Sequence, residues 1–175
     1  MVTSISWKVV ASLLSRNTEH RLIILCLQAF FSEYLRKIYG SHYDPSIHWL
    51  SSNRLRVHPD LHPERVDDGA GCDFKLTDTL GHFCSTSDEQ VTCYFEVKSS
   101  SGPFVGTFHY SENELETCKR VHDNPNHEFV LVFVEYAQSP DMVRFADVSG
   151  TGPYHGCFLW SRYGNVAPLS IAIHS

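Results

Sequence analysis

Asp73 and the triplet Glu96-Val97-Lys98 are the residues whose types and spacing best suit chemistry, and 22 residues separate Asp73 from Glu96. A carboxylate can hold a hard divalent cation, and a lysine can stabilise a developing negative charge or position a water molecule. The pattern therefore indicates a metal-assisted hydrolytic site. The structural alternative is that Glu96 and Lys98 form an exposed ion pair, which would contribute roughly 0–1 kcal/mol.

The run that carries the triplet predicts a β-strand. Val91–Lys98 is rich in β-branched and aromatic residues, which favour strands. Because side chains alternate along a strand, Glu96 and Lys98 would project from the same face. A shorter strand is predicted over Cys72–Leu76. We expect Asp73, Glu96 and Lys98 to meet at one end of these two strands and to form a concave acidic site.

Length and composition indicate one globular domain. The chain has 175 residues, of which 42% are hydrophobic and 13% aromatic, which suits a packed core and excludes a disordered chain. The formal net charge of −6 excludes a protein that simply coats nucleic acid with lysines. It does not exclude a nuclease, since metal-binding carboxylates themselves add negative charge.

Cysteine and histidine patterns select no alternative chemistry. The six cysteines contain no CxxC pair, so a structural zinc site is not expected. Several lie in apolar runs, as buried free thiols do, which favours the nucleus or the cytoplasm. The eleven histidines are mostly isolated, and nothing singles out a cysteine–histidine pair for a hydrolase. The most apolar window, Leu22–Phe31, is too short to span a bilayer, so no membrane association is expected.

A helix and several strands must position the candidate residues. Apolar residues spaced by three or four predict a helix over Glu19–Tyr39, ended by Gly40, with a core-facing stripe of Ile23, Leu27, Phe30, Tyr34 and Ile38. Ser111 and Glu114 form a capping box that predicts a helix over Glu112–Val121. The remaining elements are a possible strand within Ile47–Val57, a loop over His58–Gly71, a turn over Ser99–Pro103, a buried strand over Phe129–Val134 and a neighbouring strand over Met142–Val148.

This order of elements and motifs resembles the PD-(D/E)XK nucleases and, more narrowly, the C-terminal domain of the plant protein NO VEIN. The segments that carry the resemblance are Trp49, Gly71–Phe74, Tyr94–Ser100, Phe108–Leu115 and Phe129–Val134, within Arg21–Val148. The resemblance implies an α/β fold with a restriction-endonuclease-like core, in which helices flank a mixed central sheet. It places this domain over residues 19–150, with an N-terminal extension over 1–18 and a C-terminal extension over 151–175 that packs on the same domain.

The resemblance also implies roles for single residues. Asp73 and Glu96 would hold Mg²⁺ or Mn²⁺, and Lys98 would position the attacking water and offset charge on the phosphorane. One position departs from the family, because Gln28 stands where a supporting glutamate is usual. An amide oxygen can ligate a cation only weakly. Glu33 lies five residues further on, about 140° around the helix, so it is not an easy substitute.

Three further residues are candidates for supporting roles. Glu114 is interpreted first as a helix cap and second as a residue that faces the site, since carboxylates favour the first turn of a helix. Asn113 would face the groove on the strength of the family motif alone. Ser99, directly after Lys98, could donate a hydrogen bond to a phosphate or could belong to a plain turn.

The sequence thus predicts a metal-dependent nuclease-like domain that hydrolyses phosphodiester bonds of DNA or RNA. The alternative is a nuclease-fold module that no longer cleaves and that serves in nucleic-acid binding or protein assembly. The resemblance makes the second function plausible, because such terminal domains are often fused to ATPase-like regions of larger proteins.

Overall fold

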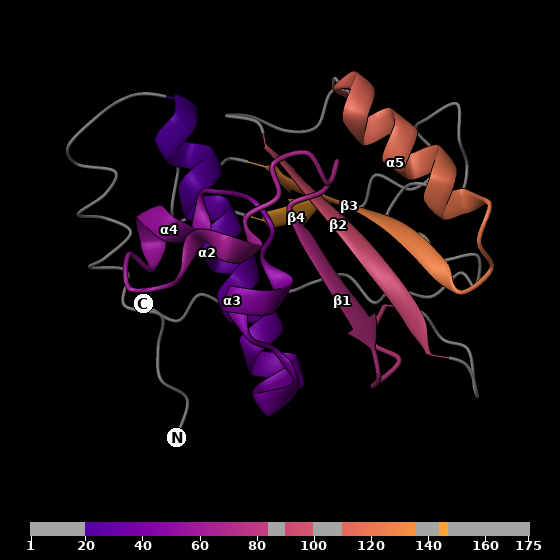
Figure 1. Ribbon diagram of the computed structural model, residues 1–175, viewed down its shortest axis with the longest axis horizontal. Coiled ribbons are helices and arrows are strands. Elements are labelled where there is room, and N and C mark those ends of the chain that lie inside the picture. The colour runs from indigo at the N-terminus through magenta and orange to yellow at the C-terminus, as the bar shows by residue number, and fades with distance from the viewer. Residues whose placement is uncertain (1–19, 84–89, 100–109, 136–143, 147–175) are drawn as a thin grey trace.

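A mixed four-stranded sheet forms the centre of the protein (Figure 1). The computed structural model describes residues 20–83, 90–99, 110–135 and 144–146. The strands, in spatial order, are β1 (Phe74–Asp78), β2 (Val91–Ser99), β3 (His127–Glu135) and β4 (Arg144–Ala146). β2 pairs antiparallel with β1 and parallel with β3, and β3 pairs antiparallel with β4. The mixed α/β architecture predicted from the sequence is confirmed.

Two helices cover opposite faces of this sheet: α2 (His20–Tyr39) and α5 (Glu112–His122). Phe95 of β2 packs against Phe31 of α2, with ring centroids 5.2 Å apart. Lys98, three residues further along β2, contacts Glu114 of α5. Because residues 95 and 98 point to opposite faces of a strand, α2 and α5 lie on opposite sides, as Figure 1 shows.

The face of α2 that packs on the sheet differs from the predicted stripe. Among the described side chains of α2, the buried apolar ones are Leu25, Leu27, Phe31, Leu35 and Tyr39, whereas Phe30, Tyr34 and Ile38 of the predicted stripe are only partly buried. The side chain of Ile23 lies outside the described residues. The predicted buried face was therefore correct at Leu27. After Leu27 the buried apolar positions are Phe31, Leu35 and Tyr39, each one residue later than the predicted Phe30, Tyr34 and Ile38. The reason is aromatic packing: Phe31 contacts both Phe95 and Phe74, with the second centroid at 5.3 Å. Burying this ring excludes Phe30 from the centre of the interface.

The segment after α2 contains short helices instead of the strand considered for Ile47–Val57. Its elements are η1 (Gly40–His42), α3 (Pro45–His48), α4 (Arg54–Val57) and η2 (Pro63–Arg65). Extended pairing is limited here to a single bridge between Trp49 and Phe74. The Asp44 side chain caps α3 by accepting from Ser46 N at 2.8 Å, and this local bond favours helix over strand.

Arg54 organises this segment although its side chain is completely buried. Its guanidinium donates hydrogen bonds to the carbonyl oxygens of Ser46, Trp49, His62 and Arg65 at 2.9–3.3 Å. Four backbone carbonyls from both ends of the segment are therefore satisfied by one side chain. This arrangement holds the irregular backbone without a regular ladder.

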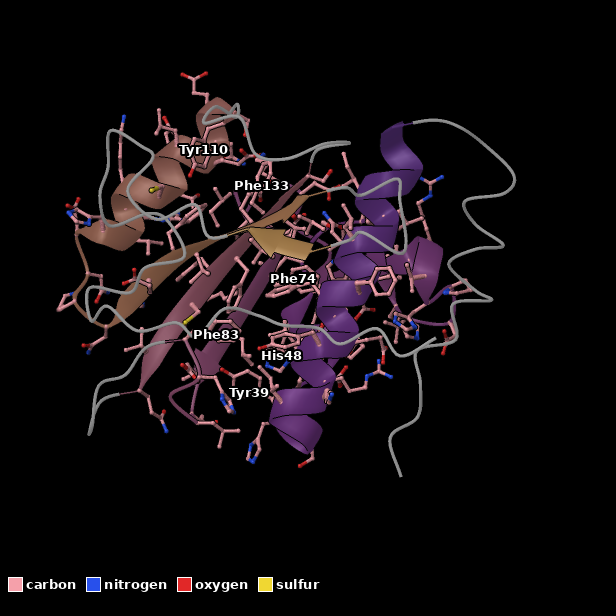
Figure 2. All side chains as sticks on the ribbon, turned by 180° about the vertical axis from the view of Figure 1, so that it is seen from behind. Tyr39, His48, Phe74, Phe83, Tyr110 and Phe133 are labelled. Atoms are coloured by element: carbon pink, nitrogen blue, oxygen red, sulfur yellow. The ribbon has the colours of Figure 1, made fainter. Side chains whose placement is uncertain are left out.

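The core lies between α2 and the sheet and continues along β3, where Phe129–Val134 are all buried as predicted for a central strand. Figure 2 shows Phe74, Phe83 and Tyr39 beside α2 and Tyr110 beside α5. The Phe83 ring lies 4.8 Å from that of Phe95 and 6.4 Å from that of Tyr39, so one aromatic cluster joins α2 to the sheet.

The predicted bounds of α2, β2 and α5 each agree with the structure to within one residue. Ser99 pairs with Val134 and ends β2, so the turn predicted over Ser99–Pro103 does not begin at this residue. The rest of that prediction, residues 100–103, lies outside the described residues. Cys72 and Cys93 are buried free thiols, as expected, but Cys118 is disulfide-bonded.

The two predicted extensions, 1–18 and 151–175, lie outside the described residues. In the described part of the chain, no helix is both long and apolar enough to cross a membrane.

Candidate active site

Asp73 stands at the point where the regular pairing of β1 with β2 begins. Its backbone N–H donates to Phe95 O at 2.8 Å, and its carbonyl accepts from Leu50 N at 2.8 Å. The ladder itself starts at Phe74, which also pairs with Phe95. Two consecutive residues therefore face one residue of β2, as in a β-bulge, a feature that redirects side chains near functional sites. From this position the Asp73 carboxylate reaches the neighbouring strand, where it accepts from Val97 N–H.

The carboxylate of Asp73 accepts a hydrogen bond on each oxygen. Gln28 Nε2 donates to Oδ1 at 2.5 Å, and the backbone N–H of Val97 donates to Oδ2 at 3.0 Å. The N–H of Val97 lies beyond the last residue pair of β1 and β2, so Asp73 supplies the acceptor that the strand does not. Asp73 is thus fixed between helix α2 and the end of the sheet, with only 8% of its surface exposed.

Gln28 is held in one orientation by short polar residues that follow Trp49. Its Oε1 accepts from Ser51 Oγ at 2.9 Å and from Asn53 Nδ2 at 3.0 Å. Trp49 Nε1 in turn donates to Ser51 Oγ at 3.1 Å. The expected position of Gln28 beside Asp73 agrees with this geometry. However, its oxygen already accepts two hydrogen bonds and its nitrogen faces Asp73, so the amide acts as a donor to the site and not as a cation ligand.

Glu96 and Lys98 lie on the same face of β2, as strand alternation predicts, with Lys98 Nζ 2.9 Å from Glu96 Oε1. The alternative of an exposed ion pair is wrong, because the exposed fractions of the two side chains are only 10% and 20%. Burial and the neighbouring Asp73 charge raise the pKa of Glu96 well above its ordinary value. This carboxyl therefore sits where negative charge is costly unless a cation is near.

Glu114 combines the two roles that the sequence left open. Its Oε2 accepts from the backbone N–H of Ser111 at 3.0 Å, and its own N–H donates to Ser111 Oγ at 3.2 Å, which completes the predicted capping box. The same Oε2 lies 2.7 Å from Lys98 Nζ. Burial alone would raise the pKa of Glu114, but the hydrogen bond and charge of Lys98, together with the hydrogen bonds from Ser111 N–H and Glu96, outweigh burial and the pKa is lowered. The first turn of α5 thus contributes an ionised carboxylate to the site.

Asn113 and Thr117 attach α5 to the chain that leads into Asp73. Asn113 Nδ2 donates to Gly69 O at 2.8 Å, and Thr117 Oγ1 donates to Ala70 O at 3.0 Å. Asn113 therefore anchors this loop. The expectation that it would face a groove is wrong, because its side-chain amide is bonded to the Gly69 carbonyl. Gly71, at φ +67°, passes so close to α5 that an added Cβ would lie 2.4 Å from Thr117 Oγ1. Only glycine fits this approach.

Sequence reasoning missed Ser51, Asn53, Thr117 and Arg54. Ser51 and Asn53 follow Trp49 closely, and that clustering of short polar residues near a motif residue was the available signal. Thr117 lies four residues after Asn113 on α5, and so on the same helix face. Nothing in the local pattern around Arg54 distinguishes it from an exposed arginine, since its four acceptors are backbone carbonyls.

Three carboxylates and one ammonium share this partly buried space, so the site has more negative than positive groups. Burial raises the pKa of Asp73 to about 7, although the Val97 N–H and Lys98 oppose the shift. Burial opposes protonation of Lys98, yet Glu96 and Glu114 outweigh it and raise its pKa. The ammonium is therefore retained at neutral pH, and the site favours either a proton or a cation between Asp73 and Glu96.

Asp73 and Glu96 are the side chains that could hold a divalent cation. Their hard oxygen atoms suit Mg²⁺, which commonly binds one or two carboxylates and completes its coordination with water and substrate phosphate. Within the described residues there is no group of three or more His, Cys, Asp or Glu side chains arranged around a metal position. A metal here would thus depend on two carboxylates, with Gln28 contributing only through Asp73.

Comparison with known proteins identifies one protein family that this chain matches. The family described as "Protein NO VEIN, C-terminal" matches residues 49–146. This stretch contains Asp73, Glu96, Lys98 and Glu114 together with the Trp49 bridge, whereas Gln28 lies outside it. Neither the search of curated proteins nor the search of solved structures found a match.

Proposed function

This chain belongs to the family of the C-terminal domain of protein NO VEIN, and from that premise we propose that it is a metal-dependent nuclease-like domain. Its sheet and flanking helices would form a restriction-endonuclease-like core of the PD-(D/E)XK type. Its reaction would be hydrolysis of a phosphodiester bond in DNA or RNA.

The observation that carries this proposal is the position of Lys98. Its Nζ is held between Glu96 at 2.9 Å and Glu114 at 2.7 Å, and the buried Asp73 lies at the end of the adjacent strand. A structural ion pair needs one carboxylate for one ammonium. Two carboxylates around Lys98, with a third near enough to raise the pKa of Glu96, are a costly arrangement that suits a site prepared for a cation.

Each residue then has a role that follows from its surroundings. Asp73 and Glu96 would hold Mg²⁺ or Mn²⁺, and the bound ion would act as a Lewis acid toward a phosphate oxygen. Lys98 keeps its proton at neutral pH and so can offset negative charge that develops on the phosphate. Glu114 contacts the same ammonium from helix α5. Gln28 orients Asp73 by donating to its Oδ1.

Gln28 also supports the alternative of a domain that binds nucleic acid or assembles with protein partners without cleaving. Both hydrogen bonds to its oxygen come from residues outside the carboxylate group, so this position adds no charge and no free ligand atom. A cation would then be held less tightly than by three carboxylates. The retention of Asp73, Glu96 and Lys98 favours the catalytic function over this alternative.

A cleavage assay tests the proposal. Labelled DNA and RNA oligonucleotides would be incubated with the protein in Mg²⁺, in Mn²⁺ and in EDTA. We expect metal-dependent cleavage that falls by about 10²-fold or more in Glu96→Gln and Lys98→Ala, since each removes an interaction made mainly in the transition state. Glu112→Gln, an exposed carboxylate in the same helical turn as Glu114, is the matched control. Binding without cleavage under all conditions would favour the non-catalytic module.

A further inference from the structure

The face of the sheet that carries Glu96 and Lys98 also presents a basic cluster nearer the start of β2. Lys75 and His127 lie beside Tyr94 on the two neighbouring strands, and burial together with the charges of Lys75 and of Arg120 on α5 lowers the pKa of His127. Lys75 Nζ, on β1, lies 4.9 Å above the centroid of the Tyr94 ring on β2. The centroid of the His127 ring, on β3, lies 5.3 Å from the same centroid. Lys75 pairs with Tyr94 in the β1–β2 ladder, so these groups are fixed by strand register. The cluster is therefore built by the sheet and by α5.

Lys75 and Arg120 have no acidic partner among the residues that the structure describes. The ion pairs formed between described residues join Arg36 to Glu33 and Lys98 to Glu96 and Glu114, and none of them involves Lys75 or Arg120. Arg120 donates to Thr117 Oγ1 at 3.3 Å. Both side chains are exposed, although the whole chain carries a formal net charge of −6. Unpaired positive charge on an acidic protein creates a local potential suited to an anion.

The charges of Lys75 and Arg120 both act on His127. The pKa of His127 is lowered first by burial and then by the charges of Lys75 and Arg120. Tyr94 and Glu96 are two residues apart on β2, which is roughly 7 Å along a strand. The basic and acidic groups are thus neighbours on one face.

Space for a ligand exists beside Lys75. This residue borders an open hollow of about 340 Å³ together with His42, His48, Thr77 and Thr92. Threonine hydroxyls and imidazole N–H groups are phosphate donors, as lysine is. The hollow extends the basic cluster across the outer strand of the sheet.

We propose that Lys75, Arg120 and His127 form a docking surface for the phosphate backbone of nucleic acid, which leads the strand to Asp73 and Glu96. The inference rests on the proposed function for its substrate class. It adds the surface that would compensate for the negative charge of the chain. Phosphate contacts of this kind position a nucleic acid without reading its sequence.

Binding of labelled DNA and RNA oligonucleotides in EDTA tests this surface without requiring cleavage. In Lys75→Ala/Arg120→Ala we expect Kd to rise at least about tenfold at low salt. The slope of log Kd against log salt should fall by about 0.9 per lost contact on duplex DNA and about 0.7 on a single strand. The matched control is Arg36→Ala/Lys37→Ala, which removes the same charge from exposed positions of α2 on the opposite side of the sheet. Circular dichroism would check that both variants fold.

The outcomes separate this inference from the proposed function. Equal affinity and equal salt slope in the two double variants would overturn the docking surface, as would a wild-type protein that binds no oligonucleotide at low salt. Binding that depends on Lys75 and Arg120 supports the surface even where the cleavage assay with Glu96→Gln and Lys98→Ala shows no metal-dependent activity. In that case the surface stands and the nuclease proposal fails.

Discussion

Gln28 Nε2 donates a hydrogen bond to Asp73 Oδ1 across 45 positions of sequence, and so links helix α2 directly to the candidate metal ligand. The amide cannot turn around without losing the bonds that Ser51 and Asn53 make to its oxygen. This network explains how a neutral residue can occupy the supporting position: it fixes the orientation of Asp73 while leaving the charge of the site to Asp73, Glu96 and Glu114.

Gln28→Glu should destabilise the protein in EDTA and increase its response to Mg²⁺. The change replaces a donor by a second carboxylate against Asp73, and loss of one buried hydrogen-bond partner costs about 1–3 kcal/mol. A bound cation would offset the repulsion. Thermal unfolding with EDTA and with Mg²⁺, together with calorimetric titration of Mg²⁺, measures both effects. Gln28→Ala removes the donor without adding charge and serves as the control. The prediction is wrong if Mg²⁺ stabilises Gln28→Glu no more than the wild type.

Metal-free wild-type protein should lose stability as the pH rises. Asp73 has a folded-state pKa of about 7 against 3.8 for the free side chain, so the folded state binds the proton more tightly. The stabilising contribution is complete below 3.8 and is lost as the pH rises through about 7. Urea unfolding in EDTA across this window should show a steeper fall for the wild type than for Asp73→Asn. Parallel curves would mean that Asp73 does not carry the effect.

Gly71→Ala should destabilise the protein far more than Gly40→Ala. Both glycines have positive φ, +67° and +54°, but an added Cβ at Gly71 meets Thr117 Oγ1 at 2.4 Å, whereas Gly40 has nothing within 4 Å. Backbone strain alone costs about 1–2 kcal/mol and applies to both positions. We expect an additional loss of about 1–3 kcal/mol at Gly71 from steric overlap, measured by urea unfolding. Equal losses would show that the α5 contact yields easily.

Arg54→Met should be strongly destabilising, whereas Arg56→Met should have little effect. Removing the Arg54 guanidinium leaves four carbonyl oxygens without their donor, and each buried unsatisfied group costs about 1–3 kcal/mol before relaxation and water entry. Arg56 is exposed on the same short helix, where substitutions usually change stability by about 0.5 kcal/mol or less. Chemical unfolding of both variants gives the comparison. A near-neutral Arg54→Met would indicate that the segment is held by other contacts.

The sequence by itself determined the elements whose signals are local. The apolar content of β2, the alternation that puts Glu96 and Lys98 on one face, and the Ser111–Glu114 capping box all depend on neighbours within a few residues, and each agrees with the structure. The helix α2 was found for the same reason. Its buried face was rotated after Leu27, because the spacing pattern contains both Phe30 and Phe31 and only contact with Phe74 and Phe95 selects between them.

Only the tertiary structure decided how the site is held together. The orientation of Gln28, the second role of Glu114 at Lys98, the anchoring of the Gly69–Gly71 loop by Asn113 and the burial of Arg54 are contacts between residues distant in sequence or between side chain and backbone. Burial also sets the pKa of Asp73, and burial depends on which helices cover a strand end. Local spacing can place a carboxylate on a face, but the charge that it carries there depends on what the fold brings against it.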